Sequence, residues 1–583
     1  MCGIAGVLGP PDDRPETIAA HEAQARAMIG KLKHRGPDGI RVETVGGSAL
    51  AHARLSIIDL EGGWQPLHAA GSTIVGNGEI YNYVELTAEF GLSDKLTTGS
   101  DFEPLLHLYA LEGEKAFERL RGMYAFCLIG GDGRTWLVRD PFGIKPLYSG
   151  GPASGFAFAS EPRCFGQPSK LGSSEGLDDI RDLLTLGYTL PSPQIWPGTR
   201  RSPGSVSESR PNEDGTWYHR LPWLKDSVRP APTDEAESLS RLDAVLEDSV
   251  RVHQRSDVPY GLFLSGGIDS TAIATLMARL NTRPVTAFTC GFDAPGAADE
   301  RAQAERVAKA LNLDWRETTF TEEDFWRIAP QVASALDDPT TDYACLPTYK
   351  LAEAAKGTLT VVLSGEGGDE LFAGYGRYRR ALRPNWLGGR PAEPQIDAPF
   401  LKDGGAGALA RWRDTAKRPG PGLTPLQQAQ WADIATWLPN DLLLKLDRML
   451  MAHGLEGRTP FLDREVAAFA WSLPDRLKVR GRYGKWILRK WLERACPAAD
   501  PWAKKQGFTV PVASWIAPRA ADLGPRIAAL QGIAEVCDVG AVRSVFADPS
   551  QGKHWWPLMF YALWWTLHVG GASPKEAAEA LCF

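Results

Sequence analysis

The pattern of apolar and polar positions divides the chain into two halves of different character. In the first half, short apolar runs bounded by Gly-Gly, Asn-Gly and Gly-Asp-Gly turns predict strands, and apolar residues at helical spacing predict helices between them. Strands connected by short turns favour an α+β unit with largely antiparallel sheets. The predicted strand regions are 3–9, 49–60, 72–82 and 123–140, and the predicted helices are 16–33 and 101–119.

In the second half, apolar strands alternate with helices. This alternation predicts a parallel sheet that is covered by helices on both faces. The predicted strands lie at 260–264, at 285–292 and at the start of 360–370, and the predicted helices at 237–255, 271–280 and 299–311.

Two stretches interrupt these patterns. Residues 200–217 are dense in Pro, Gly, Ser and charge, which is typical of a domain boundary. Residues 383–413 are a second irregular stretch, which we interpret as an insertion in the second unit; the irregularity extends to residue 430. We therefore expect a first domain at 1–210, a linker at 211–235 and a second domain at 236–583.

Composition narrows the class of protein. A chain of 583 residues is too long for one hydrophobic core, so at least two domains are expected. The net charge of -7 gives no general attraction to nucleic acid or to an anionic membrane. The most apolar stretch, 555–571, is shorter than a bilayer requires and contains Pro557 and His568, so it predicts a core helix.

The cysteines and the first residues indicate a cytoplasmic protein. The eight cysteines are scattered without zinc-like spacing, which disfavours a metal–thiolate site and is typical of reduced thiols. The opening MCGIAGVLGP has no basic region, and its apolar run ends at Pro10 and Pro11, so we do not expect a signal peptide.

The stretch LSGGIDS (264–270) lies where an apolar strand meets a helix. Its glycines allow a sharp turn, so that successive backbone N–H groups and the helix N-terminus can face one anion. Ser265 and Ser270 add hydroxyl donors, and Asp269 adds a carboxylate suited to Mg²⁺. Glycine-serine turns are common at strand–helix connections. The fixed positions of this one, however, resemble the pyrophosphate loop of enzymes that cleave ATP to AMP and pyrophosphate, and we expect a nucleotide here.

A second cluster, SGEGGDE (364–370), follows another apolar strand. Because ligands bind at the carboxyl ends of parallel strands, both loops are expected to face one crevice. Asp269 and Asp369 are then placed to share Mg²⁺, and Glu366 to act as a base or to orient a nucleophile. The alternative, a solvated acidic turn, is disfavoured because the acids follow a buried strand.

Cys2 directly follows the initiator methionine. Removal of Met1 would leave a thiol and a free α-amino group on the same residue, a nucleophile with its own base. The alternative is a cysteine that packs as a small apolar residue. Ten residues alone favour that alternative.

Blocks of sequence along nearly the whole chain resemble the glutamine-dependent asparagine synthetase family. The first half resembles its class II glutamine amidotransferase domain, and the second half its ATP-pyrophosphatase domain. The blocks are MCGIAG, HRGPDG (34–39), ARLSIIDL (53–60), NGEIYN (77–82), GSD (99–101), RDPFGIKPLY (139–148), SGGIDS, SGEGGDE and KLDRMLMAHGLEGRTPFLD (445–463). The resemblance implies an N-terminal αββα sandwich of the Ntn type and a C-terminal parallel-sheet α/β domain.

The resemblance also implies a glutaminase site in the first domain. Cys2 would attack the side-chain amide of glutamine, and its own amino group would shuttle protons. Asn77 and the backbone N–H of Gly78 would form the oxyanion hole. The charged groups of glutamine would be held by Arg54 at the α-carboxylate and by Glu79 and Asp101 at the α-ammonium.

In the second domain, the resemblance implies that ATP and aspartate form β-aspartyl-AMP. Ammonia, arriving by an internal apolar passage, would then displace AMP. Glu366 would assist proton removal and Lys485 would contact phosphates. The implied ATP-binding residues are Leu264, Ser265, Gly266, Gly267, Asp269, Ser270, Cys290, Ser364 and Gly365, with Asp269 and Asp369 for the metal and Arg458, Lys505 and Glu370 as further candidates.

The acceptor of the ammonia is not marked by a motif of its own. No short motif identifies an aspartate pocket, and residues 337–349 are assigned to it only by their position before the second loop. An amidotransferase that acts on another carboxylate, such as a sugar uronic acid or a peptide side chain, remains an alternative. The expected cofactors are ATP and Mg²⁺, and the expected partners are small substrates and possible second copies in a homodimer, without nucleic acid or membrane.

Overall fold

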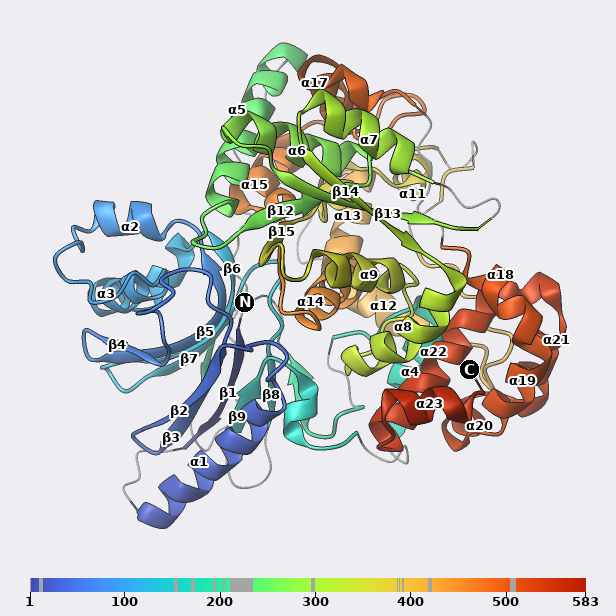
Figure 1. Ribbon diagram of the computed structural model, residues 1–583, viewed down its shortest axis with the longest axis horizontal. Coiled ribbons are helices and arrows are strands. Elements are labelled where there is room, and N and C mark those ends of the chain that lie inside the picture. Colours follow the sequence, from blue (N-terminus) through green and yellow to red (C-terminus); the bar gives the residue numbers. More distant parts are fainter. Residues whose placement is uncertain are drawn as a thin grey trace.

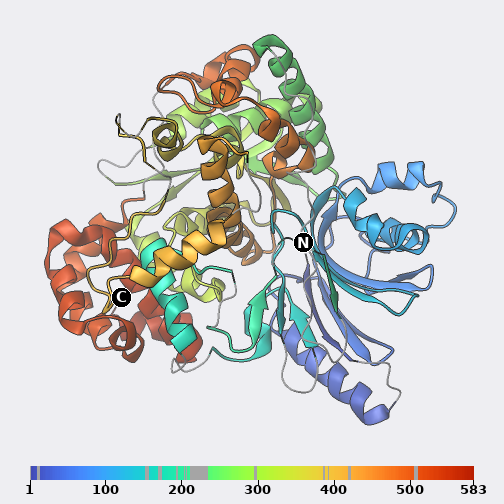
Figure 2. The same cartoon turned by 180° about the vertical axis from the view of Figure 1, so that it is seen from behind.

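The computed structural model describes residues 2–582 except 10–13, 151–155, 169–173, 192–194, 203, 205, 210–233, 295–298, 385, 387, 391–392, 418–421 and 504–509. The chain forms a sandwich of two sheets beside a larger α/β body, and the two are in broad contact (Figure 1). Both views place the amino terminus in the middle of the molecule, between these two parts (Figure 2).

The sandwich has four layers. One sheet has the strand order β10-β8-β9-β1-β3-β2 and the other β11-β7-β6-β5-β4, with antiparallel pairing at each described ladder. Helix α1 (Pro15–Gly30) covers the first sheet, and α3 (Glu103–Glu112) covers the second (Figure 1). The strands are β1 (Gly3–Leu8), β2 (Gly39–Val45), β3 (Ser48–Arg54), β4 (Leu67–Ala69), β5 (Ser72–Ile80), β6 (Gly122–Ile129), β7 (Thr135–Arg139), β8 (Tyr148–Gly150), β9 (Phe156–Ala159), β10 (Thr199–Arg201) and β11 (Val206–Ser209).

Alternation of side chains along the strands produces this sandwich. On β1, Ile4 and Leu8 point between the sheets, whereas Ala5 and Val7 point toward α1. Successive strand residues face opposite sides, so a strand that is apolar on both faces is buried from both. Consequently, β1 begins in the interior and brings Cys2 with it.

The second body is built on a parallel sheet with the strand order β14-β13-β12-β15-β16. Helices α5 (Glu235–His253), α6 (Ile268–Leu280), α15 (Arg464–Ser472) and α17 (Trp486–Ala495) pack on one side, and α9 (Cys345–Ala355) and α14 (Leu443–Met451) on the other. The strands are β12 (Tyr260–Phe263), β13 (Thr286–Phe292), β14 (Asp314–Phe320), β15 (Val361–Leu363) and β16 (Glu456–Arg458).

A second helical core lies at the far end of this body. Helix α22 (Trp555–Trp564) is buried along its length and packs against α8 (Glu322–Ala335), as predicted for the Trp-rich stretch. The remaining C-terminal helices are α18 (Val512–Ile516), α19 (Ala520–Ala528), α20 (Gln531–Val536), α21 (Val539–Ala547) and α23 (Pro574–Ala580). Within the described residues, no helix combines the length and apolarity that a membrane crossing requires.

Helix α4 (Ser174–Leu186) departs from a simple division of the chain. It precedes residue 210 but packs against α12 (Ala406–Ala416) and α22, whereas β10 and β11 return to the sandwich. Helix α4 thus precedes the expected boundary at 210 in sequence but packs on helices of the second body. Helix α12 also corrects the expectation for 383–413, because the irregular stretch contains a regular helix in its last part.

The other predicted elements agree with the structure except at their ends. The predicted strand 49–60 is too long, because β3 ends at Arg54 and the following residues are irregular. The predicted helix 101–119 is α3 followed by a 3₁₀ helix at Gly113–Arg119. The predicted strands did not include β2, β4, β8, β9, β10 and β11 of the sandwich. They also did not include β14, which is largely polar, and β16, which has only three residues.

Candidate active sites

Cys2 lies at the start of β1 and contacts three other segments of the sandwich. Its backbone N–H donates to Asn77 Oδ1 (3.0 Å), and its Sγ lies 3.7 Å from the carbonyl oxygen of Leu55. Its own carbonyl oxygen accepts from Arg35 Nε (3.3 Å). Burial raises the pKa of the Cys2 thiol, an effect that the nearby amino terminus partly offsets. The residue is thus fixed at its nitrogen, side chain and carbonyl, which differs from a cysteine that only fills space.

Asn77 and Gly78 lie on β5 beside Cys2. The Nδ2 of Asn77 is buried and has no acceptor among the described residues, although its Oδ1 is used by Cys2. Gly78 has a φ of +129°, and a Cβ there would run into the carbonyl oxygen of Met123 on β6. A buried donor without a partner is costly unless a ligand supplies the acceptor. This pair has the composition of an oxyanion hole.

Arg54 ends β3 with its side chain buried. One terminal nitrogen, Nη2, donates to the carbonyl oxygen of Asp59, and the guanidinium stacks on Trp64 at 4.9 Å from the ring centroid. The other, Nη1, has no acceptor among the described residues. Burial lowers the pKa of Arg54, and nearby acids partly offset this effect. A fixed guanidinium with an unused donor suits a carboxylate ligand.

Glu79 and Asp101 place two carboxylates in the same region. Asp101 Oδ2 accepts from the Ile80 N–H (2.6 Å), and burial raises the pKa of Asp101 to about 7. Burial likewise raises the pKa of Glu79, against the opposing charge of Arg458. Buried carboxylates with raised pKa values are stabilised by a cation, so the pair suits an ammonium group.

Arg458 occupies a different place from the one expected. Its guanidinium lies at the boundary with the sandwich, where it pairs with Glu456 (2.6 Å) and Glu79 (3.3 Å) and donates to the carbonyl oxygens of His253 and Arg255. These contacts direct its side chain toward Glu79 of the sandwich. Glu456, whose influence on Cys2 raises the thiol's pKa, is a site residue that the sequence analysis missed.

The first of the two predicted nucleotide loops, at 264–270, joins β12 to α6. Ser265 Oγ and Ser270 Oγ are 3.0 Å apart, and the Gly267 N–H lies 3.2 Å from Ser265 Oγ. Gly266 has a φ of +73°, and a Cβ there would approach Gln303 Cγ to 2.8 Å. The loop therefore turns tightly with its serines folded over the N-terminus of α6, as expected for an anion-binding turn.

The second loop, between β15 and α10 (Gly368–Phe372), packs directly on the first. A Cβ at Gly365 would lie 2.8 Å from Asp269 Cβ, so the glycine is needed for this approach. Lys485 Nζ lies between the two loops, contacting Asp269 Oδ2 and, at 2.6 Å, Asp369 Oδ1. Burial disfavours the charged amine, but both acids outweigh it and the pKa of Lys485 is raised.

Lys485 is the N-cap residue of α17 and has a φ of +55°, a conformation rare for residues other than glycine. Its backbone N–H donates to the carbonyl oxygen of Phe372 (3.1 Å). The tight turn therefore aims the amine between Asp269 and Asp369. The structure brings these three predicted residues together at the carboxyl ends of β12 and β15, the edge expected for a ligand.

Glu366 lies at the same edge and has a neighbour that the sequence analysis missed. Lys445 Nζ is 3.9 Å from Glu366 Oε1 and 2.9 Å from Asp342 Oδ2. Burial raises the pKa of Glu366, and Lys445 partly offsets this. Asp342 lies within 337–349, so the predicted acceptor segment does reach the predicted base. The signal that could have identified Lys445 was its place in the conspicuous KLDR block.

The remaining predicted residues line these loops or lie outside the described part. The Leu264 N–H donates to the carbonyl oxygen of Phe288, the Ser364 N–H to that of Arg458, and Cys290 is buried on β13. Glu370 accepts from Tyr375 Oη (2.6 Å), and burial raises its pKa to about 8. Lys505 falls outside the described residues.

Comparison with known proteins bears on both sites. A family model described as a glutamine amidotransferase domain matches residues 1–212, and one described as asparagine synthase matches residues 241–568. The chain belongs to the asparagine synthase family. The matches confirm the resemblance read from the sequence and assign the amidotransferase fold to the sandwich that carries Cys2.

Several curated members of the family are similar over most of the chain. The chain is 33% identical to asparagine synthetase [glutamine-hydrolyzing] 1 of Bacillus subtilis, covering 88% of each sequence. It is 33% identical to a putative asparagine synthetase [glutamine-hydrolyzing] of Mycobacterium tuberculosis (strain ATCC 25618 / H37Rv), covering 99% of each. Asparagine synthetase B [glutamine-hydrolyzing] of Escherichia coli is 30% identical, over 88% of this chain and 83% of that one.

Proposed function

We propose that this asparagine synthase family member transfers the amide nitrogen of glutamine to aspartate and consumes ATP. The observation that carries the proposal is the pairing of two prepared sites in one chain. One has a cysteine at the second position beside unused donors of Asn77 and Arg54; the other has two loops bridged by Lys485. The names of the relatives support the same reaction.

In the first site, we propose that the mature chain begins at Cys2. The freed α-amino group, held by Asn77 Oδ1, would take the thiol proton as Sγ attacks the glutamine side-chain amide. Asn77 Nδ2 and the Gly78 N–H would stabilise the oxyanion, and the amine would return the proton to the amide nitrogen, which leaves as ammonia. Water would then hydrolyse the glutamyl thioester, which releases glutamate and restores the thiol. Arg54 would bind the α-carboxylate, and Glu79 with Asp101 the α-ammonium.

In the second site, we propose that the loops at 264–270 and 364–370 bind ATP. The N–H groups and hydroxyls of the first loop would hold the pyrophosphate, and Lys485 would neutralise it. Asp269 and Asp369 offer oxygen donors from two loops, a donor set that fits Mg²⁺ bound together with substrate phosphates. The ion would supply charge neutralisation as pyrophosphate leaves.

Glu366 and Lys445 would handle the proton of the amidation step. Ammonia that attacks an acyl-adenylate must lose a proton, and Glu366 lies at the edge where the nucleotide loops meet the 337–349 segment. Because burial raises the pKa of Glu366, its carboxylate is a better base for this proton than an exposed glutamate would be. Lys445 would link Asp342, in the segment expected to bind the acceptor, to the base Glu366.

We propose that ammonia moves between the sites inside the molecule. Support comes from the contact between the domains, where Leu55, Met123 and Ile144 of the sandwich belong to the same apolar cluster as residues of the second body. Leu55 is also the residue whose carbonyl oxygen lies near Cys2 Sγ. Apolar walls would keep ammonia unprotonated and therefore nucleophilic.

The proposal is tested by supplying glutamine, Mg-ATP and aspartate to the purified protein. We expect asparagine, glutamate, AMP and pyrophosphate in equal amounts. Glutamate without asparagine would contradict aspartate as the acceptor while leaving the glutaminase site intact.

Three broader assignments are also proposals. We propose domains at 1–210 and 236–583 joined by 211–235, a cytoplasmic location and a homodimer. Among the eight cysteines, all of which the structure describes, each is free, which agrees with a reducing compartment. Sedimentation would test the dimer, which rests on family resemblance alone.

A further inference from the structure

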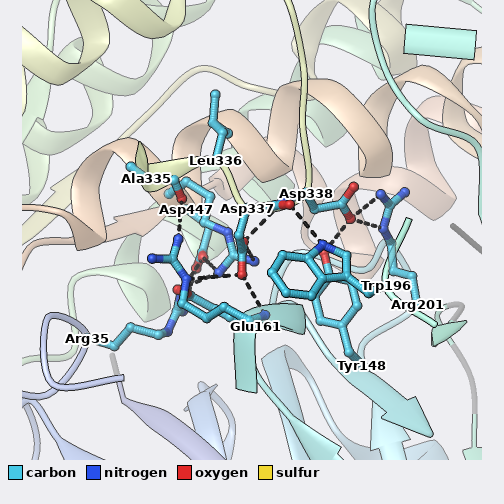
Figure 3. A network of polar contacts seen from close by, with 12 residues as sticks. Arg35, Tyr148, Glu161, Trp196, Arg201, Ala335, Leu336, Asp337, Asp338 and Asp447 are labelled. Carbon is cyan, nitrogen blue, oxygen red and sulfur yellow. Dashed lines mark hydrogen bonds and ion pairs between the residues drawn. The ribbon is translucent and has the colours of Figure 1, made fainter. Parts of the chain in front are cut away.

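The nucleophile's main chain is held by a residue that is itself held by the other domain. Arg35 donates through Nε to the Cys2 carbonyl oxygen, and its two terminal nitrogens donate to the two oxygens of Asp447 (2.7 and 3.0 Å). Asp447 lies on α14, in the second body. Figure 3 shows Arg35 reaching from the sandwich to Asp447, with Glu161 beside the pair.

This pair is fully enclosed. The side chains of Arg35 and Asp447 are 0% and 2% exposed. Burial alone would raise the pKa of Asp447, but Arg35 outweighs it and the pKa is lowered. A bidentate pair fixes the plane of the guanidinium, which a single contact would leave free to turn. The direction of Nε, and hence of its bond to Cys2, is therefore set by Asp447.

Arg448, the residue after Asp447 on α14, makes further ion pairs beside Arg35. Arg448 contacts Glu161 (2.5 Å) and Asp337 (2.9 Å), and Glu161 also accepts from Arg35 Nη1 (2.9 Å). The cluster alternates positive and negative side chains across the domain boundary, so no buried charge lacks an opposite neighbour.

The same helix reaches the synthetase site. Lys445, two residues before Asp447, contacts Asp342 (2.9 Å) and lies 3.9 Å from Glu366. One short helix thus contacts the proposed acceptor machinery with one residue and the holder of the glutaminase nucleophile with another. No assigned role in the proposed reaction uses Arg35 or Asp447.

We propose that Arg35 and Asp447 are positioning residues of the glutaminase half-reaction: Asp447 orients Arg35, and Arg35 orients the backbone of Cys2. The nucleophile is then correctly placed only while α14 is docked on the sandwich. This inference rests on the proposed function of Cys2. It makes the synthetase domain a structural part of the glutaminase site.

The test compares Asp447→Asn, Arg35→Lys and the double variant with the wild type. Glutamate release is measured for glutamine hydrolysis, and synthesis from added ammonium is measured separately. We expect Asp447→Asn to lower kcat for hydrolysis about 10- to 100-fold, the scale of a slightly misplaced reacting group. KM for glutamine should change less than about threefold, because Arg54, Glu79 and Asp101 are untouched, and ammonium-supported synthesis should stay within about twofold.

The double variant identifies the order of action. If Asp447 acts through Arg35, the double variant is no slower than Arg35→Lys alone. Multiplied losses would contradict the proposal. Labelling of Cys2 by an electrophilic diazoketone analogue of glutamine, measured by mass spectrometry, gives a second readout that does not depend on turnover. The rate of labelling should fall in parallel with the rate of hydrolysis.

Asp463→Asn is the matched control. Asp463 also makes a buried ion pair across the domain boundary, with Arg121 Nε (2.7 Å), but it does not contact Cys2 or Arg35 in the described structure. Asparagine can still cap α15, as Asp463 does. We expect hydrolysis within about twofold of wild type. Equal losses in Asp463→Asn and Asp447→Asn would show general loosening of the interface and overturn the proposal, as would unchanged hydrolysis in Asp447→Asn.

The outcomes separate this inference from the proposed function. A wild type that releases glutamate but makes no asparagine would refute aspartate as acceptor, and the variants would still test positioning. A wild type that does not hydrolyse glutamine would refute both the role of Cys2 and the role assigned to Arg35 and Asp447.

Discussion

Individual donors without partners are the clearest sign of function in the sandwich. Asn77 Nδ2 and Arg54 Nη1 are buried, and neither has an acceptor among the described residues. Native structures rarely leave such groups unpaired, because each costs about 1–3 kcal/mol. A ligand with an oxyanion and a carboxylate would satisfy both at once, and glutamine in the transition state for amide hydrolysis offers both groups.

Removing the Asn77 donor should therefore slow chemistry more than binding. We expect Asn77→Ala to lower kcat for glutamine hydrolysis about 10²- to 10³-fold, as for other single oxyanion donors. KM for glutamine should change little. Initial rates of glutamate release over a range of glutamine concentrations measure both, and a change confined to KM would assign Asn77 to ground-state binding instead.

The pKa of Asp101 predicts the acid side of the pH profile. Because burial raises this pKa to about 7, the group becomes neutral as the pH falls through that value and no longer attracts an ammonium. We expect kcat/KM for glutamine to decline as the pH falls below about 7. In Asp101→Asn, kcat/KM should be lower at every pH, and the decline near pH 7 should be absent. The pH profile of glutamate release measures this; an unchanged acid limb in the variant would exclude Asp101 as its source.

At the scale of elements, the second candidate site is formed by the carboxyl ends of two strands and the start of a helix from a distant part of the chain. Lys485 lies in an unusual conformation at the start of α17 and reaches acids at the ends of two strands. Asp269 and Asp369 would repel each other without a cation between them. The lysine thus holds the two loops in contact before any substrate binds.

Replacing that lysine should separate the two half-reactions. We expect Lys485→Ala to lower ammonium-supported synthesis more than about 100-fold, since it removes a cation from developing phosphate charge. Glutamine hydrolysis without ATP should stay near wild type. Parallel assays of pyrophosphate and glutamate check this; equal loss of both would indicate damage to the fold.

The elements that the sequence predicted well are those with strong apolar patterns, such as β1, β13, α6 and α22. The polar edge strand β14 and the three-residue β16 carry too little pattern to be found. In the candidate sites, the sequence pointed to motif residues because each motif is local in sequence. Lys445 and the Arg35–Asp447 pair act through contacts between residues that are distant in the sequence, and the side-chain contact of Arg458 with Glu79 could not be read from its motif for the same reason.

At the scale of the whole molecule, the glutaminase site is built at a domain boundary. Glu456 and Arg458 reach toward Glu79 from one side, and Asp447 holds Arg35 from another. The apolar cluster that includes Leu55 and Met123 continues into the second body. Under the proposed function, ammonia released in the first site would lie against the domain that uses it.

The central claim is that nitrogen released at Cys2 is incorporated at the second site of the same molecule. The direct measurement supplies glutamine labelled with ¹⁵N in its amide, together with Mg-ATP, aspartate and unlabelled ammonium, and follows the label in the product. We predict that asparagine carries ¹⁵N in its amide well above the share of ¹⁵N in free ammonium, and that Cys2→Ala makes only unlabelled asparagine from ammonium. Asparagine with the same ¹⁵N content as free ammonium, or labelled asparagine from Cys2→Ala, would contradict the account.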